Sequence, residues 1–315
     1  MILLTGATGF VGQAVFARLA GKMPLRIVLR DAHKKFSAKH PDYEISLARL
    51  SKEQDWTSSL KNVSCIIHLA ARAHIVKETA PDPLAKFRDV NTEGTLALAE
   101  QAYHLGVKRF VFVSSIKVNG EITKPGNPFR TQDIPAPVSN YGISKMEAEK
   151  GLMVLSAKTG MEIVIIRPPL VYGPGVKGNF AHMVYWLKKG TPLPFGAIHN
   201  QRSFVALDNL VDLLVTCIDH PAAANEIFFV SDDEDVSTTE LLHRLGRAIG
   251  CPARLIPIPE KLLQAAATLF GRQDIATRLC GSLQVDIEKT KNLLDWTPPL
   301  TLDAGLRKIH SETIV

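Results

Sequence analysis

Cysteine is scarce in this sequence, with four residues in 315. The four lie far apart, and no two form a CxxC pair; they are Cys65, Cys217, Cys251 and Cys280. A disulfide framework or a cysteine-based metal site needs closer, repeated spacing, so both are excluded. We expect reduced and mostly buried thiols, as in a cytoplasmic protein.

Long hydrophobic runs are also missing. The first apolar run, residues 1–4, ends at Thr5 before it reaches the length of a signal peptide. The longest later runs, around residues 110–116 and 262–271, fall short of the roughly 20 residues that cross a bilayer. We therefore expect no secretion, no transmembrane segment and a cytoplasmic location.

The excess of positive charge is small, because 37 Lys and Arg face 31 Asp and Glu for a net charge of +6. Basic residues occur in short pairs rather than in a stripe with aromatic residues between them, which excludes a nucleic-acid partner. The ten histidines show no HxxxH or HExxH spacing, so we expect no metal. A small anionic ligand remains compatible with this charge.

What the sequence does contain is an alternation of short β-branched runs with helix-length amphipathic stretches. This rhythm is typical of a parallel sheet with helices on both faces. The predicted strands are 2–4, 26–29, 65–69, 109–113 and 163–166, and the predicted helices are 11–19, about 84–105 and 140–159. The expected fold class is α/β, a doubly wound parallel sheet of the Rossmann type.

The first predicted strand runs into Thr5–Gly12, a glycine-rich loop that opens a helix. Glycines at such a turn let the backbone approach a pyrophosphate, whose charge meets the free N–H groups of the helix. The spacing is GxxGxxG rather than GxGxxG, but the flanking strand and helix predict a dinucleotide site. The predicted cofactor contacts in this loop are Gly6, Gly9, Phe10, Val11 and Gly12.

The end of the second strand indicates which dinucleotide binds. An acidic residue there would bind the ribose 2′-hydroxyl of NAD, but Arg30 stands at this place, and its guanidinium suits the 2′-phosphate of NADP. The next residue, Asp31, suits a bare ribose if the strand end is shifted by one. NADP(H) is therefore favoured, and NAD(H) is the alternative.

After Arg167 the composition shifts to closely spaced prolines and glycines, which indicates an exit from the sheet. The predicted dinucleotide-binding domain comprises residues 1–168 and about 202–230. A smaller C-terminal substrate-binding lobe comprises residues 169–201 and about 231–315. Within that lobe, the apolar stretch 261–271 could be an amphipathic interface or a membrane-surface segment, but we expect it to be core.

Three side chains form a candidate catalytic group. Tyr141 and Lys145 are four residues apart in a predicted helix and share a face, so the lysine is expected to lower the pKa of the phenol. Ser114 and Ser115 directly follow a buried parallel strand, whose end lies at the edge where such folds bind ligands. Ser115, Tyr141 and Lys145 are therefore the predicted catalytic residues.

Several motifs in this order resemble the extended short-chain dehydrogenase/reductases, over essentially the whole chain. Later motifs resemble the nucleotide-sugar epimerase/dehydratase branch of that superfamily. The first set is TGxxGxxG at 5–12, HLAA at 68–71, NTEGT at 91–95, SS at 114–115, YxxxK at 141–145 and RP at 167–168; the second is VYGPG at 171–175, NF at 179–180 and RSFVxxD at 202–208.

The resemblance implies roles for these residues. Tyr141 would be the general acid/base, Lys145 would lower its pKa and hold the nicotinamide ribose, and Ser115 would bind the reacting sugar oxygen. Further cofactor contacts would come from Leu69, Ala70, Asn91 and Pro168. The nucleotide diphosphate of a UDP-linked sugar would be held by Asn179, Arg202 and Arg278.

The sequence departs from hexose 4-epimerases at two places. Ile116 and Lys117 follow the serine pair, and Ala73 stands where those enzymes have a cofactor-contacting lysine. With Arg30, these changes favour an NAD(P)H-dependent 4-ketoreductase of a UDP-linked keto-deoxy sugar, similar to enzymes of bacterial surface polysaccharides. The alternative is a UDP-hexose or UDP-N-acetylhexosamine 4-epimerase with tightly bound NAD. A second alternative is a noncatalytic dinucleotide sensor, and a homodimer is left open.

Overall fold

The computed structural model describes residues 1–31, 43–73, 81–271 and 273–311. Seven strands build its main sheet, and all are parallel. They are β1 (Ile2–Thr5), β2 (Leu25–Leu29), β3 (Tyr43–Leu47), β4 (Cys65–His68), β5 (Arg109–Val113), β6 (Glu162–Arg167) and β9 (Glu226–Phe229). Their order is β3-β2-β1-β4-β5-β6-β9. The chain reverses its direction of travel across the sheet between β3 and β4, as in a doubly wound fold.

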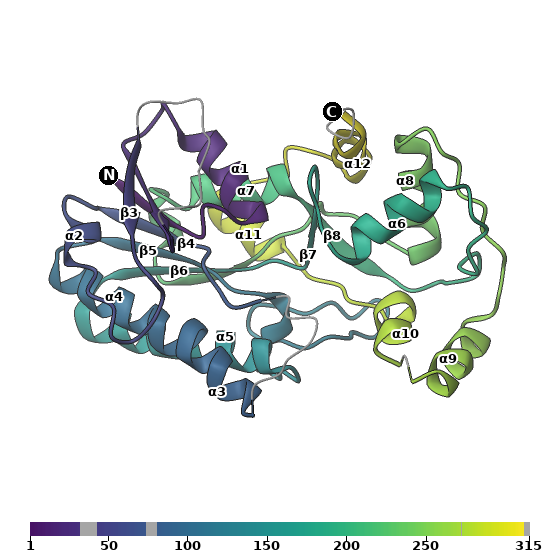
Figure 1. The fold of residues 1–315 in the computed structure, drawn as a ribbon, viewed down its shortest axis with the longest axis horizontal. Helices are drawn as coiled ribbons and strands as arrows, with labels where there is room; N and C mark the ends of the chain where they lie inside the picture. The colour runs from purple at the N-terminus through teal and green to yellow at the C-terminus, as the bar shows by residue number, and fades with distance from the viewer. Residues whose placement is uncertain (32–42, 74–80, 272, 312–315) are drawn as a thin grey trace.

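Helices cover both faces of this sheet (Figure 1). One face carries α2 (Thr57–Leu60), α3 (Pro83–Phe87), η1 (Arg88–Glu93), α4 (Gly94–His104) and α5 (Asn140–Thr159); the other carries α1 (Phe10–Leu19), α7 (Leu207–Thr216) and α11 (Glu288–Leu294). Because both faces are buried, the central strands need no polar alternation: Phe110, Val111 and Phe112 of β5 are fully buried. This explains why apolar runs alone predict the central strands.

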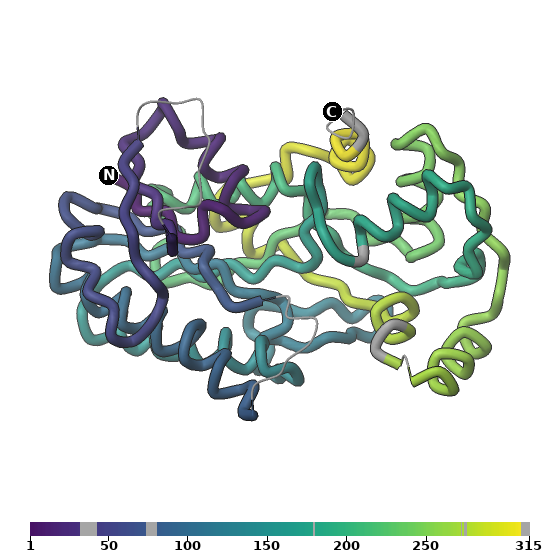
Figure 2. Tube along the Cα trace, viewed as in Figure 1, coloured from purple at the N-terminus to yellow at the C-terminus, as the bar shows by residue number. Residues whose placement is uncertain are grey.

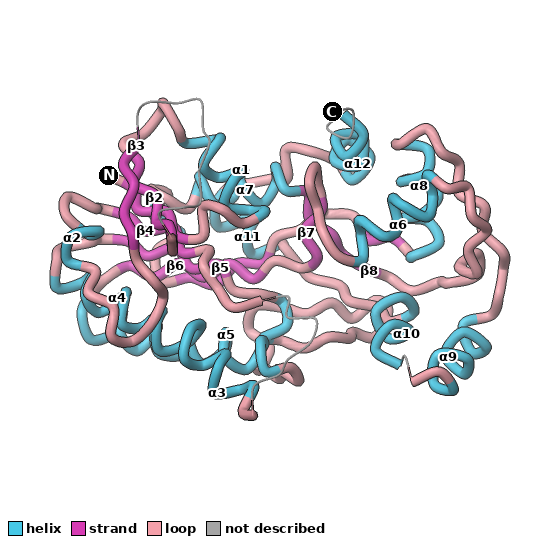
Figure 3. The backbone as a smooth tube through the Cα atoms, viewed as in Figure 1, coloured by secondary structure: helices cyan, strands magenta, loops and turns pink. Residues whose placement is uncertain are grey.

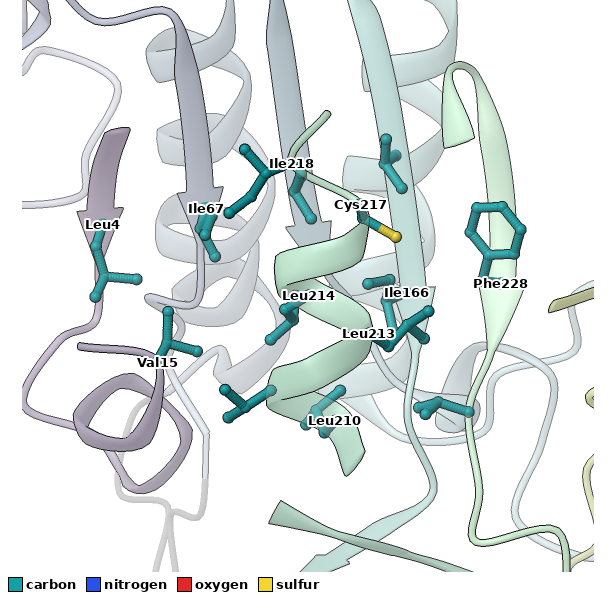
Figure 4. Close-up of a cluster of buried hydrophobic side chains, with 14 of the residues drawn as sticks. Leu4, Val15, Ile67, Ile166, Leu210, Leu213, Leu214, Cys217, Ile218 and Phe228 are labelled. Atoms are coloured by element: carbon teal, nitrogen blue, oxygen red, sulfur yellow. The ribbon is translucent and has the colours of Figure 1, made fainter. Parts of the chain in front are cut away.

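The apolar core of one face lies between the sheet and α7. Leu210, Leu213 and Leu214 of α7 pack toward Ile166 of β6 and Phe228 of β9 (Figure 4). All five side chains are fully buried. Strand β9 is the last strand of the main sheet.

A second, three-stranded sheet has the order β10-β8-β7, formed by β7 (Leu170–Tyr172), β8 (Arg202–Ala206) and β10 (Asp235–Val236). Around it lie α6 (Asn179–Lys188), α8 (Thr238–Ala248), α9 (Glu260–Leu269), α10 (Gln273–Cys280) and α12 (Leu302–Ser311), at the end of the molecule away from the N-terminus (Figures 2 and 3). Two short 3-10 turns are η2 (Ile116–Val118) and η3 (Pro221–Ala223). In the described chain, no helix is long and apolar enough to cross a membrane.

Local signals fix several boundaries. Helix α5 begins after Ser139, whose hydroxyl accepts a hydrogen bond from the backbone N–H of Gly142, and it ends at Gly160 with φ +75°.

The helix predicted over about 84–105 is instead divided into α3, the π-helical turn η1 and α4. A hydrophobic period near 3.6 residues does not distinguish a continuous α-helix from one interrupted by a π turn.

The prediction that residues 261–271 form core is wrong. Helix α9 has no buried residue, and Leu269 and Phe270 are 83% and 76% exposed. The amphipathic pattern predicts an apolar stripe on this helix, but it does not specify that another element of the chain covers the stripe.

Candidate active site

The glycine loop between β1 and α1 makes two close backbone approaches. A Cβ on Gly6 would lie 2.7 Å from the backbone nitrogen of Ala70, and one on Gly12 would lie 2.1 Å from the carbonyl oxygen of Gly6. Gly6 also has φ +73°, which favours glycine. Gly9 precedes α1 and has no side chain to cap it, so no N-cap side chain occupies the first N–H groups of the helix, including those of Phe10 and Val11, and they can serve as donors.

A buried chain of hydrogen bonds ties this loop to the end of β4. The hydroxyl of Thr5 accepts from the backbone N–H of Ala70 at 3.2 Å and lies 2.8 Å from Nδ1 of His68, whose Nε2 lies 3.0 Å from the hydroxyl of Thr95. Burial lowers the pKa of His68 to about 3, so the ring is neutral and has one acceptor and one donor nitrogen. The network holds Leu69 and Ala70 against the glycine loop, as expected for backbone that borders the cofactor.

Strands β5 and β6 deliver the next candidate residues to the same edge of the sheet. Ser115 follows β5, is partly buried and caps η2, where its Oγ accepts from the backbone N–H of Lys117 at 3.3 Å. The carbonyl oxygen of Pro168, which follows β6, accepts from the backbone N–H of Ile116 at 3.0 Å. Ser115 and Pro168 therefore lie on adjacent, hydrogen-bonded segments.

The predicted pair of Tyr141 and Lys145 lies in the first turns of α5. The Lys145 side chain is 1% exposed, its Nζ donates to the carbonyl oxygen of Val113 at 2.8 Å, and it lies 4.1 Å above the ring of Phe112. The ring of Tyr141 makes an edge contact with Phe87. Because Val113 ends the strand that Ser115 follows, Lys145 lies at the same edge of the sheet as Ser115, and Tyr141 lies one turn earlier in the same helix.

The pKa values correct the expected effect of the lysine on the tyrosine. Burial raises the pKa of Tyr141 to about 12, and burial lowers the pKa of Lys145 to about 7, against the opposing charge of Glu149. The expectation that Lys145 lowers the pKa of Tyr141 is not met, because desolvation of the phenol dominates and the lysine amine is directed at the Val113 carbonyl.

Asn91 is fully buried within η1 and braces two segments. Its Oδ1 accepts from the backbone N–H of Arg72 at 2.7 Å, and its Nδ2 donates to the Arg72 carbonyl oxygen and to Oγ of Ser144. Thr92 donates to the carbonyl oxygen of Ser144. The side chain expected to contact the cofactor thus fixes the turn of α5 between Tyr141 and Lys145. Sequence reasoning missed the roles of Ser144 and Thr92, although Thr92 lies in the NTEGT motif and Ser144 in the YxxxK motif.

An ion pair that sequence reasoning also missed lies behind the catalytic helix. Arg167 of β6 and Glu149 of α5 are 2% and 4% exposed, and Arg167 Nη1 donates to Oδ1 of Asn119 at 2.9 Å. The spacing from Lys145 to Glu149 was a signal available in the sequence, because residues four apart share a helix face.

The two residues that bear on the choice of dinucleotide lie at the end of β2. Arg30 is exposed there. Asp31 is half-buried and accepts from Nη2 of Arg49 at 3.3 Å. Both residues thus lie where the sequence places them, after the last residue of the strand.

The candidate substrate residues lie in the second lobe. Asn179 is the first residue of α6, and its side chain is outside the described part of the structure. Arg202 begins β8, is half-buried, and donates from Nη1 to the carbonyl oxygen of Gly281 at 2.8 Å. Arg278 is exposed in the last turn of α10, just before Gly281. Arg202 and the segment that carries Arg278 are therefore in contact.

A glycine-rich strand–loop–helix turn beside a serine, a tyrosine and a lysine on a doubly wound sheet defines an extended short-chain dehydrogenase/reductase. A model of the NAD dependent epimerase/dehydratase family matches residues 2–231, and the chain belongs to this family. The expected fold, enzyme class and family are thereby confirmed.

The chain is 48% identical over 308 residues to a UDP-glucose 4-epimerase of Vibrio cholerae, which covers 98% of this chain and 93% of the relative. Two solved structures share its fold. A UDP-glucose 4-epimerase of Thermotoga maritima with UDP-glucose is 24% identical at a TM-score of 0.78 and covers 99% of this chain and 98% of its own. A UDP-glucuronic acid 4-epimerase of Bacillus cereus in complex with NAD is 20% identical at a TM-score of 0.78, with coverage of 99% and 96%.

These findings change the order of the functional hypotheses. They favour the alternative, a 4-epimerase, over the 4-ketoreductase that was expected first. The family is named for its dependence on NAD, and the expected preference for NADP stays a prediction.

The lowered pKa of Lys145 predicts a pH dependence of stability. Between about 7 and the ordinary value of 10.5, the unfolded chain binds a proton that the folded protein does not bind, so the contribution of Lys145 to stability rises with pH. We expect the free energy of unfolding of the wild type, relative to Lys145→Met, to increase from about pH 7 to about pH 9 in denaturant titrations. Lys158→Met, at an exposed lysine of the same helix, should show no such trend. Parallel pH profiles for wild type and Lys145→Met would contradict the assignment.

Proposed function

We propose that this protein is a UDP-hexose 4-epimerase that uses NAD, with Ser115, Tyr141 and Lys145 as its catalytic residues. The observation that carries this proposal is the 48% identity, over 98% of the chain, to a UDP-glucose 4-epimerase. The shared edge at which β5, β6 and α5 place the three residues supports the same assignment.

The glycine loop fits a dinucleotide. Its backbone lies so close to β4 and α1 that side chains on Gly6 or Gly12 would fill the space, and the uncapped start of α1 offers N–H donors to a pyrophosphate. Leu69, Ala70 and Pro168 would border the ring end of the cofactor. When bound, NAD supplies a reversible hydride acceptor for C4 of the sugar.

The chain's own residues would handle the sugar oxygen. Ser115 would bind the C4 oxygen, and Tyr141 would accept its proton and return it. Lys145, whose Nζ donates to the Val113 carbonyl, would have to turn toward the phenol to lower the Tyr141 pKa, and its own pKa of about 7 allows it to carry the charge at neutral pH. Inversion at C4 requires the ring to present its other face, so the nucleotide must stay anchored while the ring turns. Arg202, with Asn179 and Arg278, is proposed to hold the diphosphate.

The two proposed binding functions correspond to the two lobes. We propose that residues 1–168 and about 202–230 bind the dinucleotide, and that residues 169–201 and about 231–315 bind the nucleotide sugar. In support, β9 lies in the main sheet and α7 packs on α1, whereas α6 and α8 surround the small sheet. Strand β8 joins that small sheet and carries Arg202, so it links the two parts.

A 4-ketoreductase is the second candidate, and one observation favours it. Arg30 is exposed at the end of β2, the position at which a guanidinium would meet the 2′-phosphate of NADP. A reductase uses up one NADPH or NADH in each cycle. An epimerase instead returns the hydride to the sugar and so regenerates its NAD.

The two candidates are separated by an assay without added cofactor. We expect the purified protein to interconvert UDP-glucose or UDP-N-acetylglucosamine with its C4 epimer, and to release NAD on acid denaturation. The hydride that leaves C4 returns to it, so no reductant is needed. Absence of epimerisation, together with stoichiometric oxidation of NADPH by a UDP-linked 4-keto-6-deoxy sugar, would establish the reductase instead.

Tyr141→Phe tests the proton-transfer role. The variant removes one hydroxyl and should lower kcat by about 10²- to 10⁴-fold, while cofactor content and thermal unfolding stay close to wild type. Tyr103→Phe, at a tyrosine of α4 that is 39% exposed, is the matched control and should keep full activity. Near wild-type turnover in Tyr141→Phe would remove this residue from the mechanism.

Arg202→Ala tests the diphosphate site. A hydrogen bond to a charged group contributes about 1.5–3 kcal/mol, so Kd for UDP in calorimetry should rise by roughly tenfold or more. Arg254→Ala, at an exposed arginine of the same lobe, should bind UDP as the wild type does. Equal UDP affinity in the wild type and Arg202→Ala would show that the guanidinium serves only to hold the Gly281 carbonyl.

A further inference from the structure

Helix α9 stands out from the second lobe with its apolar side uncovered. Leu262, Leu269 and Phe270 are 61%, 83% and 76% exposed, and the helix has no buried residue. In Figure 1 it lies at the lower right edge of the molecule, next to α10. Soluble surfaces carry single apolar side chains routinely, but a contiguous group of large ones indicates a binding surface.

The exposed residues form a stripe rather than a scatter. Leu262, Ala266, Leu269 and Phe270 follow the i, i+4, i+7, i+8 spacing that places them on one side of a helix. Residues 260, 261, 264 and 268 are polar and lie on the opposite side. Helix α9 is therefore amphipathic, and its apolar side is the one with the largest exposure.

Charge around the stripe favours an anionic partner. Lys261 is exposed on α9, and Arg254 is exposed just before it. The acidic residue of the first turn, Glu260, accepts from the backbone N–H of His199 at 2.7 Å and so is turned toward the body of the lobe. An exposed lysine next to exposed leucine and phenylalanine is a combination found in helices that lie in a membrane interface.

A second copy of the chain is a poorer match for this surface. The three large side chains expose on the order of 400 Å², whereas a stable interface needs about 800 Å² from each partner. The interfacial region of a bilayer has no such minimum, because apolar burial and attraction to anionic lipids add to each other.

Helix α9 is also connected to the proposed substrate residues. It packs on α10, and the segment after α10 provides the Gly281 carbonyl to Arg202 and pairs Ser282 with Thr123. We propose that α9 lies on the surface of an anionic membrane and holds the substrate-binding lobe there. This surface goes beyond the proposed 4-epimerase activity and does not depend on it.

Vesicle flotation tests the proposal with the full-length protein. Vesicles of phosphatidylglycerol and phosphatidylcholine in roughly equal amounts should bind the wild type at low ionic strength, and binding should fall when salt is raised to about 0.5 M or when phosphatidylcholine is used alone. Leu262→Glu/Phe270→Glu should reduce the bound fraction by about tenfold or more, because it removes the two ends of the stripe. Lys261→Glu should weaken binding to the anionic vesicles only.

The matched control is Ile45→Glu/Leu47→Glu. It replaces two apolar side chains of the edge strand β3 that are 53% and 55% exposed, at the other end of the molecule, and it should float as the wild type does. Turnover of a soluble UDP-sugar should be unchanged in all these variants, which separates this inference from the proposed activity. Absence of wild-type flotation, or equal flotation of Leu262→Glu/Phe270→Glu, would overturn the proposal. Loss of self-association in that variant, without vesicle binding by the wild type, would assign α9 to a contact between two copies.

Discussion

The close contact between the glycine loop and the end of β4 is the constraint on which the rest of the site depends. A side chain on Gly6 would meet the Ala70 backbone at 2.7 Å, so only a bare backbone permits this approach. The hydroxyl of Thr5 stabilises the same contact, because it accepts a hydrogen bond from the backbone N–H of Ala70 and lies 2.8 Å from Nδ1 of His68. The start of α1 and the ends of β4, β5 and β6 lie at one edge of the sheet, the edge at which open α/β folds bind ligands.

Helix α5, which carries Tyr141 and Lys145, is held to this edge by buried polar contacts at successive turns. Lys145 reaches Val113 of β5, Ser144 is bonded to Asn91, and Glu149 pairs with Arg167 of β6. Buried charges are costly unless they are paired, and here the lysine meets a carbonyl and an aromatic face while Glu149 lies one turn away. In this setting burial lowers the pKa of Lys145 to about 7 and raises the pKa of Tyr141 to about 12.

Local sequence signals predict those parts of the molecule that local forces determine. The expected strand 109–113 and helix 140–159 match the structure, because a buried apolar run, a serine cap and a glycine stop define them. Strand β3 was not predicted, since most of its side chains are half-buried or exposed at the sheet edge. The Arg202 contact with Gly281 and the pKa of Tyr141 depend on residues distant in the chain and on burial, so spacing alone gives neither. The exposure of the apolar stripe of α9 could not be predicted for the same reason. Periodicity indicates that a helix has an apolar side, but it does not show whether another element covers that side.

The departures from the epimerase sequence pattern also show that a local motif alone does not reveal why a residue is there. Ile116 is 4% exposed and belongs to the core that packs under the sheet, and Lys117 donates to Glu121 at 2.9 Å on the surface. Packing and a surface ion pair therefore account for these two residues without any change of chemistry at Ser115. Two departures still bear on the cofactor: Ala73, which stands where the epimerases have a cofactor-contacting lysine, and Arg30, which lies at the end of β2, where the ribose of a dinucleotide bound along this edge would reach. For the proposed 4-epimerase, cofactor choice and reaction type would thus be separable: a guanidinium at the end of β2 would bear on the 2′-group of the ribose, whereas the fate of the hydride at C4 would depend on how the second lobe holds the sugar.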